Sequence, residues 1–316
     1  MIINRSVIPV QACKSVIPAE AYVPVIAAKA GLARSVIPAK AGIQLSCLAW
    51  VFLFLCPCLA CAQDPLGQGE FFRSPQEHVR GKIESSSMSA VFPWFPEVLR
   101  FEVKWGLLSV GWATMKIEEI QDFAGKPAFH IVSDAKSNAF CDAFYKVRDL
   151  NESWIDVSDL RSLGYSKKLH EGDFFRDEWV RFDYERKAFF SKRFDKDGVV
   201  VSSSGTLAGT PVQDMLSSIY YLRPKSLKVG ESVILDVNTK SDWPLIVKVL
   251  RKEKITVPAG TFNTVLVEPA VRKEGIFVQK GNRLQVWLTD DERHVPVFMS
   301  VQVFFGHVSA YLLKGP

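Results

Sequence analysis

Beyond its first 61 residues the sequence has very little cysteine. Five of its six cysteines lie in that stretch, and only Cys141 follows it. One cysteine cannot form an internal disulfide, so a folded domain in the rest of the chain depends on its apolar core. The roughly 254 residues after Ala62 are enough to build such a core.

Motifs for metals, nucleotides and nucleophilic catalysis are also missing. The five histidines form neither a His-x-His nor a His-Glu-x-x-His pattern, so a zinc site has no support in the sequence. There is no Gly-x-Ser-x-Gly turn and no phosphate-binding loop. Cys141 beside Asp142 is the one conceivable nucleophile, but a lone cysteine is more often a small buried apolar residue. We therefore expect no catalytic residue, no metal and no cofactor.

Net charge is small once the N-terminus is set aside. The whole chain has 39 Lys and Arg against 34 Asp and Glu. Residues 1–62 contain five of the basic and one of the acidic residues, which leaves 34 and 33. Because the remaining basic residues are interleaved with acids, we expect no nucleic-acid partner.

Short repeats occupy the N-terminus. Ser-Val-Ile-Pro recurs at residues 6–9, 15–18 and 35–38, with unequal spacing. A repeat fold needs a fixed period, so these units do not predict one. The run Ser35–Gln44 resembles the peptide obtained when short dispersed bacterial DNA repeats are translated. That resemblance implies a true start downstream of the first methionine or an inserted repeat, and residues 1–44 are expected to lie outside the fold.

Residues 45–62 have the features of a secretory signal. The run is uncharged and apolar, basic residues precede it, and Ala60-Cys61-Ala62 places small residues where a signal peptidase reads them. Lipidation at Cys61 stays open, because Leu59-Ala60-Cys61 resembles the end of a lipobox. An uncleaved anchor also stays open, although the run is marginal against the roughly 20 residues of a membrane span. We predict export to the periplasm or association with the cell envelope.

The rest of the chain has the pattern of a β-protein. Residues 63–96 are rich in Pro, Gly and Ser without sustained periodicity, and we interpret them as a linker or an ordered arm. From Leu99 onward, apolar and polar residues alternate with period two in successive runs, as from Val297 to Phe305. We expect a single mainly-β domain over residues 97–316, built as a large curved antiparallel sheet or a partly closed β-barrel.

One covering helix is expected over about 211–223. Thr210-Pro211 is a suitable start, and apolar residues follow at helical spacing. A helix of this kind packs on a curved sheet. Alternatively, its polar residues Asp214, Ser217 and Ser218 form a polar site.

Several motifs of this region occur together in one known family. They are Phe101-x-Val-x-Trp-Gly106, Val110-Gly-Trp-Ala113, Asp214-x-Leu-Ser-x-x-Tyr-Tyr-Leu-Arg223, Glu253-x-x-x-Val-Pro-Ala-Gly-Thr-Phe262, Gly275-x-Phe277 and Val286-Trp-Leu-x-Asp-Asp291. With them, residues 99–313 resemble the bacterial domain-of-unknown-function family 3108. The resemblance implies an exported or envelope-associated, mostly β domain of no established activity. More loosely, the region is similar to half-barrel periplasmic lipoprotein carriers, an analogy of fold that does not fix function.

Aromatic residues recur on the expected strands, and barrel mouths lined by such residues are common ligand sites, although each ring can equally fill a core. They are Trp105, Trp112, Phe129, Trp154, Phe174, Trp179, Phe189, Trp287 and Phe305. We predict a non-enzymatic envelope protein that binds an apolar or lipid-like ligand. The candidate contacts are Trp105, Trp112, Asp214, Tyr220 and Trp287.

Two alternatives stay open. One is a structural or assembly module that binds another envelope protein or a cell-wall polymer through strand edges or the 63–96 arm. The other is an enzyme of unrecognised type with Asp214 or Asp290 in a polar pocket. In the acidic turn, however, Asp290 and Asp291 are better explained as turn-stabilising residues, since Asp binds its own backbone there.

Overall fold

The computed structural model describes residues 73–84, 95–207, 209, 211–239, 241–270, 283–303 and 306–314, all within a unit that spans residues 39–316. The expected leader (1–44) and signal (45–62) lie outside the described residues. No helix among the described residues is long and apolar enough to cross a membrane.

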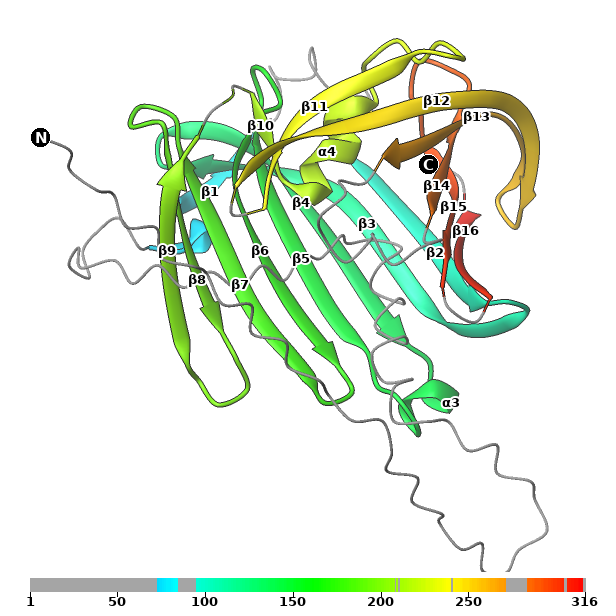
Figure 1. Ribbon diagram of the computed structural model, residues 1–316, viewed down its shortest axis with the longest axis horizontal. Helices are drawn as coiled ribbons and strands as arrows, with labels where there is room; N and C mark the ends of the chain where they lie inside the picture. Colours follow the sequence, from blue (N-terminus) through cyan, green and yellow to red (C-terminus); the bar gives the residue numbers. More distant parts are fainter. Residues whose placement is uncertain are drawn as a thin grey trace, which may run out of the picture. The chain divides into compact units, whose positions relative to one another are not determined.

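Strands make up most of the described chain (Figure 1). In the first half they are β1 (Val79–Ile83), β2 (Glu97–Trp105), β3 (Leu108–Phe123), β4 (Lys126–Ser137), β5 (Arg148–Asp156), β6 (Ser162–Glu171), β7 (Phe174–Asp183), β8 (Ala188–Phe194) and β9 (Val200–Thr206). In the second half they are β10 (Val212–Gln213), β11 (Ser232–Asn238), β12 (Asp242–Val257), β13 (Gly260–Ala270), β14 (Leu284–Thr289), β15 (Pro296–Gln302) and β16 (His307–Lys314). The helices are η3 (Pro75–His78), α3 (Ala139–Asp142) and α4 (Met215–Leu222).

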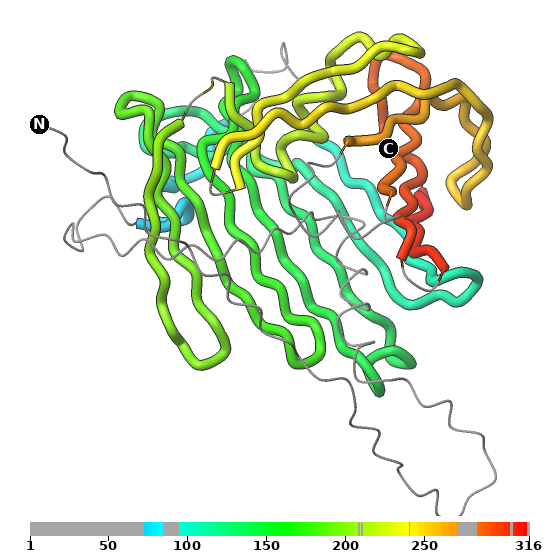
Figure 2. Tube along the Cα trace, viewed as in Figure 1, coloured from blue at the N-terminus to red at the C-terminus, as the bar shows by residue number. Residues whose placement is uncertain are grey.

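All the strands belong to one sheet. Strands β2 to β9 follow one another as an antiparallel meander, and β11 to β16 form a second one. The two meanders join where β16 pairs with β2, and among the described strands only the short β10 pairs in parallel, with β11. The described sheet does not close, because β10 and β9 stand at the two ends of its order. The tube in Figure 2 shows the second meander folding back over the first. This architecture confirms the predicted curved antiparallel sheet.

The period-two pattern separates the sheet into two faces. On β2, Leu99, Phe101 and Val103 are buried and alternate with more exposed residues. They belong to a large apolar cluster that includes Met215 and Leu216 of α4. We call this side of the sheet the inner face and the opposite side the outer face. In Figure 1, α4 lies between β11 and the strands β4 and β5, which it contacts.

The covering helix exists but begins later than expected. Asp214, not Thr210, is its N-cap, and Val212–Gln213 form strand β10 instead of a first helical turn. Asp214 forms a capping box with Ser217, whereas β10 gains ladder hydrogen bonds from β11. The capping box and the pairing with β11 together favour this later start over a helical turn that begins at Pro211.

Part of the 63–96 arm is ordered. Helix η3 leads into β1, which pairs antiparallel with the end of β3. At the far end of the arm, Phe95 packs on Phe129 with ring centroids 5.4 Å apart. Over residues 79–83 the arm is therefore part of the sheet, as a short strand beside β3.

Candidate functional site

Asp214 fastens α4 to the inner face. Its Oδ1 accepts hydrogen bonds from the backbone N–H groups of Leu216 and Ser217, at 2.9 and 3.0 Å. Its Oδ2 accepts hydrogen bonds from the hydroxyls of Ser153 and Ser162, both at 2.6 Å. A fully buried carboxylate with four donors is already satisfied, so its role here is to position the helix.

Tyr220 and the end of α4 are equally enclosed. Burial raises the pKa of the Tyr220 hydroxyl well above its usual range. Next to it, the Arg223 guanidinium donates to both carboxylate oxygens of Glu97, at 2.6 and 2.9 Å. Arg293 also donates to Glu97, at 3.1 Å. This buried ion pair, which the sequence reasoning missed, joins the end of α4 to β2.

The three candidate tryptophans lie elsewhere. Trp287 is buried on the outer face, donates its Nε1–H to Glu253 at 2.7 Å, and begins a row of rings with Phe298 and Tyr311. The cross-strand register continues from Tyr311 through Glu102 to Trp112, which is 51% exposed. Trp105 ends β2 and is 37% exposed. The five candidate residues therefore occupy separate places and do not form one pocket. Phe305 lies outside the described residues.

The inner face below α4 carries polar side chains in place of apolar ones. Ser133, Asn151, Lys167 and Glu178 stand directly opposite one another on β4, β5, β6 and β7. We call these four residues the polar row. All four are buried, and Lys167 Nζ lies 3.1 Å from Glu178 Oε1. Ser133 Oγ and Asn151 Oδ1 of the row are buried and make no hydrogen bond within the described part of the chain.

A small hollow connects the polar row to α4. It is lined by residues that include Asn151, Lys167, Asp214 and Leu216, and its volume is about 20 Å³. A space of that size holds about one water molecule. It has no room for an apolar or lipid-like ligand.

The larger described hollows are open and polar. One of about 850 Å³ lies over the outer face of β2 to β5, and one of about 480 Å³ lies at the ends of β14 to β16. Charges lining the first are paired within their own strands, as in Lys116–Glu118 at 3.0 Å and Lys136–Asp134 at 3.1 Å. These features are typical of a solvated sheet face.

Two carboxyl groups meet at the lower end of the inner face. Asp149 and Glu171 are almost fully buried, and the Asp149 Oδ1 accepts the backbone N–H of His170 at 3.0 Å. Burial and the charge of Asp149 raise the pKa of the Glu171 carboxyl to about 10. Burial raises the pKa of Asp149 to about 6. The pair is therefore expected to share one proton near neutral pH.

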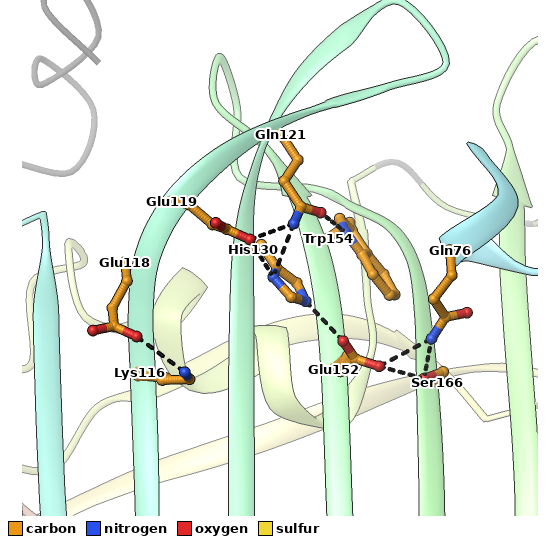
Figure 3. A network of polar contacts seen from close by, with 9 residues as sticks. All are labelled: Gln76, Lys116, Glu118, Glu119, Gln121, His130, Glu152, Trp154 and Ser166. Carbon is orange, nitrogen blue, oxygen red and sulfur yellow. Dashed lines mark hydrogen bonds and ion pairs between the residues drawn. The ribbon is translucent and has the colours of Figure 1, made fainter. Parts of the chain in front are cut away.

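A third polar cluster lies on the outer face around His130 (Figure 3). Its Nδ1 lies 3.3 Å from Glu119 Oε1 and its Nε2 lies 3.0 Å from Glu152 Oε1. The imidazole stacks on Trp154 with centroids 5.0 Å apart. Gln121 Nε2 lies 3.2 Å from the same Nδ1, so the ring, Gln121 and the two carboxylates form one hydrogen-bond network.

The ordered arm is tied to this cluster. Gln76 of η3 donates to Glu152 Oε2 at 3.0 Å, and Lys82 of β1 pairs with Glu119. Burial alone would raise the pKa of Glu119 and Glu152, but hydrogen bonds outweigh this effect and lower both pKa values. Glu119 receives them from Lys82, Gln121 and His130, and Glu152 from His130, Gln76 and Ser166. The cluster is thus an electrostatic clamp that fixes the arm to β3 and β5.

The described residues offer no site for a metal and no activated thiol. No group of three or more His, Cys, Asp or Glu in these segments is placed to hold an ion. The nitrogens of His130 point at different carboxylates, so they share no common metal position. Burial raises the pKa of the half-buried Cys141 thiol, which makes it a weaker nucleophile.

The acidic turn is structural. The Asp291 carboxylate accepts hydrogen bonds from the hydroxyl of Thr289 and from the backbone of Arg293, at 2.7 and 3.0 Å. Asp290 pairs with Lys252 at 2.8 Å on the surface. Neither carboxylate faces a deep polar pocket among those described.

Comparison with known proteins agrees with the sequence motifs. Residues 100–313 match the family described as protein of unknown function (DUF3108). The chain belongs to the DUF3108 family. No curated protein matches it.

Two solved structures are similar to parts of this DUF3108 chain. One is a beta-barrel-like protein of domain of unknown function DUF1849 from Brucella abortus, 10% identical, covering 69% of this chain and 96% of its own, with a TM-score of 0.45. The other is a candidate lipoprotein from Parabacteroides distasonis, 10% identical, covering 69% and 94%, with a TM-score of 0.28. Neither likeness carries an argument about function.

Proposed function

We propose that this DUF3108 protein is a non-enzymatic binding protein of the cell envelope that holds a neutral, hydroxyl-rich ligand group against the polar row. The observation that carries the proposal is the pair of buried, unpartnered atoms Ser133 Oγ and Asn151 Oδ1. A buried polar group left without a partner costs about 1–3 kcal/mol. The row is buried and the hollow beside it holds about one water molecule, so a ligand reaches these atoms when the inner face opens, and its O–H or N–H groups then recover that free energy.

The charge of the row supports a neutral ligand. Lys167 and Glu178 form an ion pair at 3.1 Å, so the row carries no net charge. Ser133 and Asn151 then provide hydrogen-bonding capacity without net charge. A saccharide has this chemistry, whether it is a free oligosaccharide or the head group of a glycolipid.

The packing of the apolar core supports a ligand position against the inner face of the sheet and outside that core. The cluster around Leu99, Phe101 and Leu216 is fully buried, and the hollow beside α4 has only about 20 Å³. The apolar chain of a lipid-like ligand would therefore lie outside this core. Export is supported by the signal features of residues 45–62.

Native mass spectrometry of the chain, purified from cells without denaturation, tests the proposal. We expect the wild type to carry an adduct, and Asn151→Leu to lose it because the side chain keeps its bulk but not its acceptor. Ser309→Ala, a buried site away from the row that is hydrogen-bonded to Ser300, is the matched control and keeps the adduct.

The adduct's mass distinguishes its two sources. An adduct with the mass of a saccharide and no acyl chains indicates a free glycan. An adduct that includes acyl chains and partitions into organic solvent indicates a glycolipid. A wild type without adduct, or an Asn151→Leu variant that retains it, overturns the proposal.

A further inference from the structure

Apolar side chains gather at one end of the first meander. In an antiparallel meander, alternate connections share an end, so the β2–β3, β4–β5, β6–β7 and β8–β9 connections lie together along the lower edge of Figure 1. We call the apolar residues that project from these four connections the hydrophobic rim. Its residues are Leu107, Leu108, Phe140, Phe144, Phe174 and Val199.

The rim is strongly exposed. Leu107 is 100% exposed, Phe144 75% and Phe140 61%. The connections at the opposite end are different: residues 124–125, 158–161 and 184–187 carry none of the large exposed apolar side chains described. Exposed apolar side chains that gather at one end of a protein mark an interaction site, and here the two ends of the strands differ in this respect.

The connections are fixed to one another. Asn138 donates its backbone N–H to Val110 at 2.9 Å and its side-chain N–H to Ser109 at 2.8 Å. Gly172 donates to the carbonyl of Lys146 at 2.8 Å. Gly172 has a positive φ of 57°, and a Cβ there would lie 2.7 Å from the Tyr145 ring. Three of the four connections therefore present their apolar side chains as a preorganised row.

The charges beside the rim nearly balance. Asp142 is paired with Arg148 at 2.5 Å. The other charged residues in the four connections are Lys146, Asp173, Asp195, Lys196 and Asp197. Attraction to an anionic surface therefore adds little, and apolar contact is what the rim offers.

We infer that the hydrophobic rim inserts into the interfacial region of a lipid bilayer. The four connections are separated by two strands each, so they extend over about 29 Å at about 4.8 Å per strand. They are isolated convex tips. A protein partner needs a matching pocket for every buried anchor, whereas the fluid bilayer interface receives separate apolar tips along a line.

Membrane attachment is independent of the ligand proposed for the polar row. Rim residues lie in the connections or at the first position of the strand that follows, and none belongs to the polar row. A variant that loses the rim is expected to keep its bound ligand. Loss of one activity without the other therefore distinguishes failure of this inference from failure of the proposed function.

Vesicle flotation of the exported chain tests the inference. The probes are vesicles of phosphatidylcholine and vesicles of phosphatidylethanolamine with phosphatidylglycerol. We expect the wild type to float with both, with little effect of added salt. The Leu107→Ser/Phe144→Ser double variant should bind at least about tenfold more weakly for each side chain lost.

Ile234→Ser is the matched control, because Ile234 on β11 is 64% exposed but lies away from the rim. It should float like the wild type, and all variants should unfold at the same temperature. Equal flotation of the double variant, no flotation of the wild type, or binding abolished by salt overturns the inference. So does a wild-type dimer that becomes monomeric in the double variant, since the rim would then join two copies.

Discussion

Replacing Glu171 by Gln should make the protein less sensitive to alkaline pH. Glu171 shares a proton with Asp149, and its pKa is raised from 4.5 to about 10. In the unfolded chain the carboxyl loses its proton near its ordinary pKa. Between these two values the folded state therefore binds one more proton than the unfolded state, and stability falls as pH rises.

The magnitude follows from proton linkage. One extra proton in the folded state lowers the free energy of unfolding by about 1.4 kcal/mol per pH unit. The pKa of Asp149 is about 6, so Asp149 adds nothing to the pH dependence of stability above that value. From about pH 6.5 to pH 8.5 the advantage of Glu171→Gln over the wild type should thus grow by about 3 kcal/mol.

Urea unfolding followed by tryptophan fluorescence, at constant ionic strength across this pH range, measures the effect. Glu185→Gln is the control, since Glu185 is exposed in the connection between β7 and β8. Its stability should follow the wild type at every pH. A Glu171→Gln advantage that does not change with pH would refute the shared proton.

Three further predictions concern the helix, the buried ion pair and the arm. Asp214→Ala should lower the free energy of unfolding by about 3 kcal/mol, because it removes an N-cap and leaves two buried serine hydroxyls without their acceptor, whereas Asp290→Ala should change it by less than about 0.5 kcal/mol in the same urea titration. Arg223→Met should cost about 3–5 kcal/mol, and adding Glu97→Leu should restore part of the loss in a double-mutant cycle, since the unpaired carboxylate is then gone. Glu119 and Glu152 have lowered pKa values, so their contribution is present above about pH 4.5 and lost below it; in acid thermal melts Glu152→Gln should flatten that decline, and an unchanged decline would argue against the clamp.

Much of the fold could be predicted, because the alternation of apolar and polar residues indicates a strand with one buried and one exposed face. The alternating run that begins at Val297 forms β15, and Asp290 and Asp291 lie in the turn between β14 and β15. The signal for β9 is weak, because Ser202, Ser203 and Ser204 at its centre show no apolar alternation. The helix start was misplaced because Thr210-Pro211 competes locally with Asp214, and only the pairing of β10 with β11 decides between them.

The candidate sites were harder to predict, because they depend on register. Asn151 and Lys167 are ordinary polar residues in sequence, and only the pairing of β5 with β6 places them side by side on the inner face. The hydrophobic rim did leave a signal, since Leu107, Phe140 and Phe144 are apolar residues in connections where polar ones are usual. Their common location still needed the topology, because sequence alone does not say which connections share an end.

A crystal structure of the chain, purified from cells without unfolding, tests whether the polar row holds a ligand. We expect electron density for a ligand group against the polar row, with donors within hydrogen-bond distance of Ser133 Oγ and Asn151 Oδ1. Density for ordered water alone at both atoms, in protein that also shows no adduct by mass spectrometry, would contradict it.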